Sequence, residues 1–317
     1  MTDSVSTPRL SVVLATDAYD TIRPVLSALR RQTCAAEIEP VIVLLGREAP
    51  AVRSEDLSTF PGAKVVRSVG ELAEARAAGI RAASAPIVFI GETHAYPQRG
   101  WAEALLTAFK GPWAAVVPAI GNANPTCVAS WASYLFDYGM WGPNRQSGEI
   151  RDPLIYNTAY RRDVLLSLGE GLAAALDPSE ETLWPVLLSR GHRVALASEA
   201  RILHLNVGKF RTLIHEKFCV GVVLGTHRAA RWSPLRRLLY FVVSPLIALV
   251  LFARVLRGAR FWPSGGLRPS AVGGVLIAAI AKAAGEATAY AGVKLPTAAA
   301  TLHDMEVRKV QYAGRVG

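Results

Sequence analysis

An acidic residue and a histidine stand two positions apart directly after a buried-looking apolar run. Residues 86–90 read Pro-Ile-Val-Phe-Ile, and Glu92 and His94 follow them. Positions i and i+2 of a strand face the same side, so these two side chains are expected to share one target. A carboxylate and an imidazole suit a divalent metal ion that in turn holds a phosphate. Ligands of open α/β sheets bind beyond the carboxyl ends of strands, so chemistry is expected here first.

Strand-like and helix-like segments alternate over the first 120 residues and would position this site. Short apolar runs predict strands, and apolar residues at helical spacing predict helices between them. The expected strands are 10–15, 40–45, 63–69, 86–90 and 113–118, and the expected helices are 21–32, 71–85 and 100–109. Strands separated by such helices need right-handed crossovers, so the sequence predicts an α/β fold with a mainly parallel sheet.

The following segment, residues 120–150, is rich in Gly, Asn, Pro and aromatic residues and has weak periodicity. It is expected to be irregular and to lie over the end of the sheet. Its aromatic side chains could stack on a ligand, or simply pack in the core. Beyond it, an extended segment, a helix and two short strands are expected at 153–161, 182–190, 193–197 and 201–205.

The 317 residues carry their charge unevenly. Hydrophobic residues make up 51% and the mean hydropathy is +0.26, which is apolar for a soluble enzyme and too polar for a multi-span transporter. Residues 1–200 hold 18 Lys and Arg against 21 Asp and Glu, whereas residues 201–317 hold 17 against 4. The basic part is also the apolar part, which favours an anionic membrane surface over nucleic acid as a partner. A basic face that is merely solvated is the alternative.

The composition changes after about residue 210. Residues 1–210 are therefore expected to form the catalytic domain, and residues 211–317 a basic, apolar helical tail. The N-terminus lacks the apolar run of a signal peptide, so none is expected. Three widely spaced cysteines predict neither a disulfide framework nor a zinc site, and they fit a reducing, cytoplasmic setting.

Two apolar segments of the tail could meet a membrane. Residues 238–253 carry no charge, but a spanning helix needs roughly 20 apolar residues, and Pro245 predicts a kink. Residues 271–281 are apolar but short. We expect peripheral or shallow insertion through residues 235–292 at the cytoplasmic face of the cell membrane. Two core helices of a soluble protein are the alternative.

Several blocks, in the right order, resemble family 2 glycosyltransferases with the GT-A fold. Residues 10–16, Leu-Ser-Val-Val-Leu-Ala-Thr, resemble the first strand of that family. Residues 75–83 resemble the "AxNxGxxxA" helix of the family, and residues 97–101 resemble its "PxxGW" motif. Residues 156–162 resemble its "GxNxAxRR" motif, and residues 179–191 resemble its "EDxxLxxRLxxxG" motif. Residues 285–292 resemble the "GExxGYxxG" end of membrane-associated members. The likeness covers about residues 9–292, and it implies a GT-A fold and a nucleotide-sugar donor.

The acidic "DxD" triplet of the family is replaced by Glu-Thr-His at 92–94, which is similar to a Glu-x-His version of the motif. The resemblance implies that Glu92, His94 and His204 hold a divalent metal ion. Imidazole ligands favour Mn²⁺ over Mg²⁺, which prefers oxygen and water. A hydrogen-bonded pair at a strand end is the alternative for the first two residues, and a structural histidine is the alternative for His204.

Two acidic residues precede the helix expected at 182–190. Counting back from Gly191, Glu180 falls where the family has its catalytic Asp, so it could accept a proton from the acceptor hydroxyl as a general base. Glu181 could take that role instead. The alternative is that both acids merely favour a helix N-terminus.

Donor contacts are expected from residues near the ends of strands. The acid that the family carries after its second strand is missing, and Glu48 is the substitute at that place. Arginine suits bidentate contact with a diphosphate, although a surface role is the alternative. Asp17 could instead cap the next helix. The expected donor-binding residues are Thr16, Asp17, Glu48, Arg76, Asn157 and Arg161.

The resemblance implies an inverting glycosyltransferase that moves a sugar from a UDP- or GDP-linked donor to a membrane-proximal acceptor, such as a lipid-linked one. Two alternatives stay open. One is a catalytically degenerate GT-A protein that binds a membrane or a partner, and the other is a related nucleotidyltransferase. A homo-oligomer is left open, and no nucleic-acid partner is expected.

Overall fold

The computed structural model describes residues 7–46, 52–263 and 268–314. The chain forms two compact units. Unit 1 contains Met1–Ala119 and Gln146–Leu203, and unit 2 contains Ile120–Arg145 and His204–Gly317. Residues 120–145 thus belong to the same unit as the C-terminal helices. Whether the catalytic domain ends at residue 210 stays a prediction about function.

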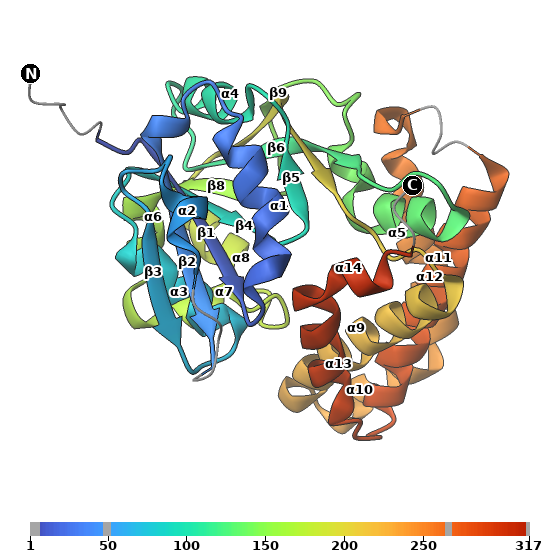
Figure 1. The fold of residues 1–317 in the computed structure, drawn as a ribbon. Coiled ribbons are helices and arrows are strands. Elements are labelled where there is room, and N and C mark those ends of the chain that lie inside the picture. Colours follow the sequence, from blue (N-terminus) through green and yellow to red (C-terminus); the bar gives the residue numbers. More distant parts are fainter. Residues whose placement is uncertain (1–6, 47–51, 264–267, 315–317) are drawn as a thin grey trace, which may run out of the picture. The chain divides into compact units, whose positions relative to one another are not determined.

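Unit 1 is built on a sheet whose strand order is β3-β2-β1-β4-β8-β6-β9-β5, with β7 paired to β9. The first four strands in that order are parallel, whereas β8 is antiparallel to β4 and β6 (Figure 1). The strands are β1 (Leu10–Thr16), β2 (Ile38–Leu45), β3 (Lys64–Ser68), β4 (Ile87–Gly91), β5 (Ala95–Pro97), β6 (Ala115–Asn122), β7 (Gly148–Glu149), β8 (Thr158–Arg161) and β9 (Val194–His204). The predicted α/β class is confirmed.

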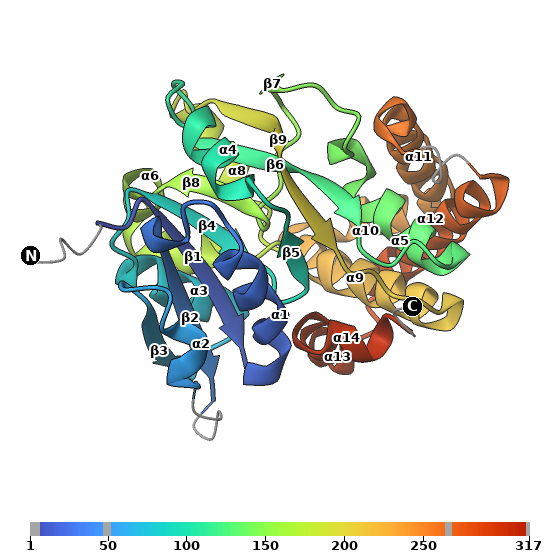
Figure 2. The ribbon, with the colours of Figure 1, turned by 45° about the horizontal axis from the view of Figure 1, so that its top comes forward.

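Helices cover both faces of this sheet. Figures 1 and 2 show α1 (Tyr19–Arg30) in front of the strands and α3 (Leu72–Ala82) behind them. The close approach of α3 requires Gly79, because a Cβ there would lie 2.5 Å from a methyl carbon of Val13. The other helices of unit 1 are α2 (Ser54–Leu57), α4 (Trp101–Ala108), α6 (Arg162–Leu166), α7 (Leu172–Leu176) and α8 (Leu183–Ser189), with 3₁₀ turns η1 (Ala35–Glu37) and η3 (Gly169–Gly171).

One strand replaces the two short strands predicted near residue 200. β9 runs unbroken from Val194 to His204. Ser198 and Glu199, which lie between the two predicted strands, are part of a continuous strand, where Ser198 is half-buried and Glu199 is exposed. The backbone N–H of Ser198 donates to the Ser147 hydroxyl at 2.8 Å, which satisfies it at the sheet edge.

Unit 2 is mostly helical. Its helices are α5 (Val128–Tyr138), α9 (Phe210–Arg231), α10 (Pro234–Val242), α11 (Ser244–Arg257), α12 (Pro269–Tyr290), α13 (Thr297–Val307) and α14 (Lys309–Tyr312), with 3₁₀ turns η2 (Gly139–Trp141) and η4 (Ala259–Phe261). The prediction that 120–150 is irregular was wrong, since it contains α5. All seven residues from Ala129 to Leu135 are buried. A helix covered on every side shows no amphipathic period, so the sequence pattern concealed it.

Helices α9 and α12 pack closely through glycines. A Cβ on Gly221 would lie 2.0 Å from the carbonyl oxygen of Lys282, and one on Gly285 would lie 2.1 Å from that of Phe218. Only residues without a Cβ allow the two backbones to approach this far. Half of the most apolar part of α12 is buried inside the protein. α12 is therefore a core helix of unit 2.

Among the described residues, α12 is the one unbroken helix long and apolar enough to cross a membrane. Helices α10 and α11 pass the same test only as a pair, and they are bent by 67° at their junction. The predicted kink thus lies before Pro245, which occupies the first turn of α11 instead of its middle. Proline is accommodated in a first turn because its missing N–H would have no partner there.

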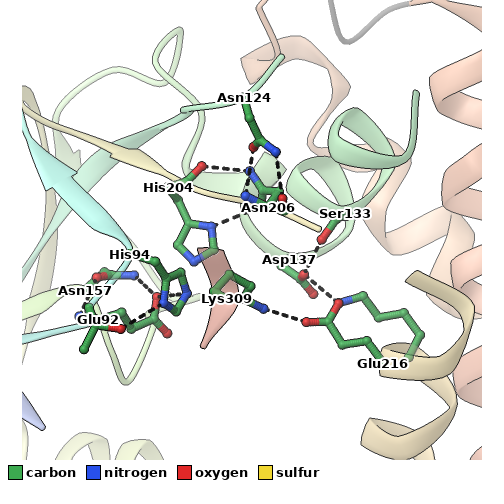
Figure 3. A network of polar contacts seen from close by, with 12 residues as sticks. Glu92, His94, Asn124, Ser133, Asp137, Asn157, His204, Asn206, Glu216 and Lys309 are labelled. Carbon is green, nitrogen blue, oxygen red and sulfur yellow. Dashed lines mark hydrogen bonds and ion pairs between the residues drawn. The ribbon is translucent and has the colours of Figure 1, made fainter. Parts of the chain in front are cut away.

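Four charged side chains form an ion network inside unit 2 (Figure 3). Lys217 Nζ lies 2.6 Å from an Asp137 carboxylate oxygen and 3.0 Å from one of Glu216, whose other oxygen lies 2.7 Å from Lys309 Nζ. Burial alone would raise the pKa of the Glu216 carboxyl, but the two ammonium groups outweigh burial and hold that pKa far below its ordinary value.

Candidate functional site

Glu92 and His94 lie in a turn between β4 and β5 of unit 1, and both are buried. The N–H of Ala95 closes this turn by donating to the carbonyl of Glu92 at 3.3 Å. Although the two residues are not on a strand, their side chains converge, with His94 Nε2 3.8 Å from Glu92 Oε2. That they share one target stays a prediction.

Asn157 fixes the carboxylate of Glu92 (Figure 3). Its side-chain Nδ2 donates to Glu92 Oε2 at 2.5 Å, and its own N–H donates to the carbonyl of Ile90 at 2.7 Å. The register of β4 and β8, in which Ile90 pairs with Thr158, places Asn157 beside the end of β4. Asn157 is fully buried, so the hydrogen bond defines the orientation of the carboxylate without competition from water.

The segment before β8 also contacts Arg76. The guanidinium carbon of Arg76 lies 3.6 Å from the centre of the Tyr156 ring, in cation–π geometry. The hydroxyl of Tyr156 donates to the carbonyl of Leu176 at the end of α7. Arg76 thus contacts Tyr156, the residue that directly precedes Asn157, and both Arg76 and Asn157 were predicted to contact the donor.

Glu180 and Glu181 lie in the connection between α7 and α8. The helix begins at Leu183, so both acids precede it instead of opening its first turn. The Asp177 carboxylate accepts from the N–H and the hydroxyl of Ser179, and the Asp177 carbonyl accepts from the Glu180 N–H. These bonds define a tight turn that fixes the backbone of Glu180.

Two non-glycine residues have positive φ among the described residues, Asn157 at 52° and Glu181 at 53°. Such conformations are costly for residues with a Cβ and gather at functional sites, where the surrounding structure holds them. The sequence had named both residues as site residues on other grounds. This backbone strain supports a functional role for both turns.

The predicted donor contacts at the end of β1 have structural partners. The Thr16 hydroxyl donates to the Ala18 carbonyl at 2.9 Å and accepts from the Ala18 N–H at 3.0 Å, which closes the turn into α1. Ala18 is the N-cap, without a side-chain cap bond, so Asp17 is not the helix cap. Glu48 lies outside the described residues.

Arg161 has a structural role in unit 1. Its Nε donates to the carbonyl of Trp113 at 2.9 Å, and its Nη2 donates to the carbonyls of Phe109 and Gly111 at 3.0 Å each. These bonds hold the connection between α4 and β6. Contact between Arg161 and a diphosphate stays a prediction.

His204 ends β9 and opens unit 2, where an asparagine network surrounds it (Figure 3). Asn206 Nδ2 donates to the carbonyl of His204 at 2.8 Å and to Asn122 Oδ1 at 3.0 Å, so its Oδ1 is the atom that faces the ring at 3.0 Å from Nδ1. Nδ1 is therefore the donor in this hydrogen bond, which makes Nε2 the ring nitrogen that could ligate a metal. Sequence reasoning missed these asparagines, although "Gly-Asn-Ala-Asn-Pro" at 121–125 was a signal.

Glu92 and His94 of unit 1 are buried and offer one carboxylate and one imidazole, donors that could hold a metal ion, and His204 of unit 2 is also buried. Borderline transition metals accept this combination of oxygen and nitrogen donors. The residues present therefore fit the metal that the sequence resemblance implies.

No protein-family model and no curated protein sequence matches this chain. Among solved structures, S. aureus TarS is similar over 65% of this chain and 38% of its own, with a TM-score of 0.45 and 16% identity. A structure of S. aureus TarS 1-349 gives 0.43 and 14%, covering 69% and 65% of the two chains. A mycobacterial protein gives 0.43 and 17%, covering 70% and 73%. This chain thus spans about two fifths of the TarS chain, and likeness of this degree does not indicate an activity.

Proposed function

We propose that this protein is an inverting glycosyltransferase that transfers a sugar from a UDP- or GDP-linked donor to a membrane-proximal acceptor. The observation that carries the proposal is the buried Glu92 carboxylate, oriented by Asn157 and 3.8 Å from His94, in the place of the acidic motif of family 2 glycosyltransferases.

Glu92 and His94 would hold a divalent metal ion, with His204 as the third ligand that the sequence resemblance implies, and imidazole ligands favour Mn²⁺. When bound, such an ion neutralises the leaving diphosphate as a Lewis acid. Asn157 keeps the Glu92 carboxylate in one orientation, and Asn206 keeps the hydrogen of His204 on Nδ1. Both arrangements prepare ligand atoms before a metal arrives.

The transfer itself would use Glu180 as the general base. The acceptor hydroxyl attacks the anomeric carbon, its proton passes to the Glu180 carboxylate, and the bond from that carbon to the diphosphate oxygen breaks. Attack opposite the leaving group inverts the anomeric configuration. Glu181 is the alternative base. Donor contacts are assigned to Arg76, Thr16 and Asp17, with Glu48 and Arg161 as further candidates.

The membrane part of the proposal rests on the basic, apolar C-terminal region. We place the protein at the cytoplasmic face of the cell membrane, where a lipid-linked acceptor would lie within reach. The 17 basic and 4 acidic residues after residue 200 favour an anionic surface. A homo-oligomer is compatible with this arrangement.

A thermal-shift screen of UDP- and GDP-sugars, with and without Mn²⁺, tests the function. We expect one donor to raise the melting temperature only when Mn²⁺ is present, because a ligand stabilises the native state by mass action. Release of the nucleoside diphosphate from that donor should follow. If donors bind without ever being turned over, the protein is a degenerate binding module. Pyrophosphate release from a nucleoside triphosphate would instead identify a nucleotidyltransferase.

Replacing Glu180 by glutamine should lower kcat about a hundredfold and leave donor binding unchanged, because a positioned general base contributes that much or more. Steady-state rates of nucleoside diphosphate release, together with donor affinity by calorimetry, give the two quantities. Glu170→Gln is the matched control, since Glu170 is exposed in η3 of the same unit. If Glu180→Gln retains full kcat, Glu180 is not the base, and Glu181→Gln then tests Glu181 in that role.

Replacing Asn157 by glycine should weaken Mn²⁺ binding about 10- to 100-fold, the usual effect of losing a partner that orients a metal ligand. Glycine accepts the positive φ of this position, so the backbone is preserved while the amide is lost. Titration calorimetry with Mn²⁺ measures the change. Asn157→Ala would lose the amide and strain the backbone as well. If Asn157→Gly binds Mn²⁺ like the natural protein, Asn157 serves only the turn.

A further inference from the structure

Helices α10 and α11 of unit 2 each present an apolar stripe to solvent. The positions i, i+3, i+4 and i+7 of an amphipathic helix form one face, which normally packs on the core. Here that face is exposed on both helices, at Leu235, Leu238, Leu239 and Val242 of α10 and at Leu246, Leu249, Val250 and Ala253 of α11. Leu235 is 77% exposed and Val242 is 64% exposed. We call these eight residues the outer stripes.

The core of unit 2 does not need the outer stripes. α10 contributes no buried residue, and α11 contributes only Ala248 and Val255. The apolar surface of α12 is used differently, because it is packed against α9 at their glycines and half of its apolar window is buried. The bent pair therefore exposes more large apolar side chains than α12, which exposes Ile277 and Ile280.

The charges around the outer stripes have one sign. Residues 232–262 contain five arginines and no acidic residue. Arg236, Arg254, Arg257 and Arg260 are exposed. The guanidinium of Arg236 also lies 4.2 Å from the centre of the Trp232 ring, so an aromatic residue accompanies the charge. Apolar stripes, flanking arginines and tryptophan are the composition of helices that lie in the interface of an anionic membrane.

We propose that the outer stripes are an in-plane membrane anchor whose occupant is an anionic phospholipid surface. At a rise of about 1.5 Å per residue, the 9 residues of α10 and the 14 of α11 reach roughly 13 and 21 Å, both short of the roughly 30 Å hydrocarbon core. The 67° bend also prevents the two from forming one straight span. Each helix would lay its stripe among the acyl chains and its arginines among the phosphates.

The inference specifies the membrane part of the proposed function and is independent of the sugar-transfer chemistry. It assigns lipid contact to α10 and α11 and gives α12 an internal role. Donor turnover in vesicle-free solution should therefore be unaffected by changes in the outer stripes. A protein that binds vesicles but turns over no donor would contradict only the proposed enzymatic activity, and the reverse result would contradict only the anchor.

Vesicle flotation with the full chain tests the anchor. Vesicles of phosphatidylcholine alone are compared with vesicles that contain phosphatidylglycerol. We expect binding to the anionic vesicles that weakens as salt is raised. Leu238→Ser with Leu249→Ser should reduce partitioning at least about tenfold, because two buried leucine side chains are worth more than 1.4 kcal/mol together. Arg254→Gln with Arg257→Gln should reduce it about tenfold or more on anionic vesicles and leave it unchanged on phosphatidylcholine.

Matched controls distinguish the anchor from nonspecific adsorption of the protein to vesicles. Val69→Ser with Leu188→Ser removes exposed apolar residues from unit 1, and Arg99→Gln removes an exposed arginine there. These variants should float like the natural protein. All changed side chains are exposed, so melting temperatures should stay the same. Absence of vesicle binding, or unchanged flotation of the serine variant, overturns the inference. Light scattering could also show a dimer that dissociates when the serine substitutions are made. That result would overturn the inference as well, because the outer stripes of two copies would then cover each other.

Discussion

Replacing Glu216 by alanine is expected to lower the free energy of unfolding by about 3–5 kcal/mol, the effect of removing one partner from a buried ion pair. Lys309 would lose the carboxylate 2.7 Å from its Nζ, and Lys217 would keep only Asp137. Both ammonium groups would stay buried, where uncompensated charge is costly. Urea denaturation followed by circular dichroism measures the loss.

The pH dependence of this effect has a definite sign. The pKa of the Glu216 carboxyl is held far below its unfolded value of about 4.3 by the two lysines, although burial acts in the opposite direction. A lowered pKa adds stability above the unfolded value that is lost as pH falls below it. The difference in the free energy of unfolding between the natural protein and Glu216→Ala should therefore be largest at pH 7 and should decrease progressively below about pH 4.5.

Two variants control this result. Lys309→Met leaves Glu216 paired with Lys217 at 3.0 Å and should cost less than Glu216→Ala. Glu170→Ala, at an exposed position of unit 1, should leave the transition unchanged. Equal stability of Glu216→Ala and the natural protein would mean that the ion network does not contribute to folding.

Replacing Glu92 by glutamine should abolish tight Mn²⁺ binding and lower donor turnover about a thousandfold or more. Glutamine has nearly the same shape, and its amide oxygen can still accept from Asn157 Nδ2, so the turn should keep its structure. What is lost is the negative charge that a divalent ion requires. Lewis-acid stabilisation of a leaving diphosphate is worth several kcal/mol, which sets the size of the expected effect.

Calorimetry with Mn²⁺ and the rate of nucleoside diphosphate release give the two readouts for Glu92→Gln. Glu199→Gln makes the same chemical change at an exposed position of β9 and should behave like the natural protein. Should Glu92→Gln keep both Mn²⁺ affinity and turnover, the carboxylate is a structural partner of Asn157 and the metal assignment fails. Loss of Mn²⁺ binding with full turnover would instead indicate a metal-independent transferase.

The local pattern of apolar residues was sufficient to predict the helices and strands in the first half of unit 1. The apolar runs at β1, β2 and β4 and the helical spacing in α1 and α3 predicted elements that the structure contains. These elements are amphipathic or buried on both faces in ways that a short window of sequence records. The pattern failed at α5, where burial on all sides leaves no period.

The candidate site was predictable only in part. Glu92 and His94 could be named because they follow a buried strand. Asn157 was named as a donor contact, but its hydrogen bond to Glu92, 65 positions away, depends on the pairing of β8 with β4. Likewise, no local feature connects Asp137, Glu216 and Lys309, which only the packing of three helices brings together.

The α/β alternation, the basic apolar C-terminal region and the residue types available for chemistry could be predicted from the amino-acid sequence, because all three are properties of neighbouring residues. Which strand lies beside β4, which carboxylate Asn157 orients and which apolar helices are exposed became clear only from the folded chain. Those outcomes depend on contacts between distant segments, whose energies no single stretch of the chain contains. The exposed stripes of α10 and α11 show the difference, since their sequence resembles that of core helices and only the fold leaves them uncovered.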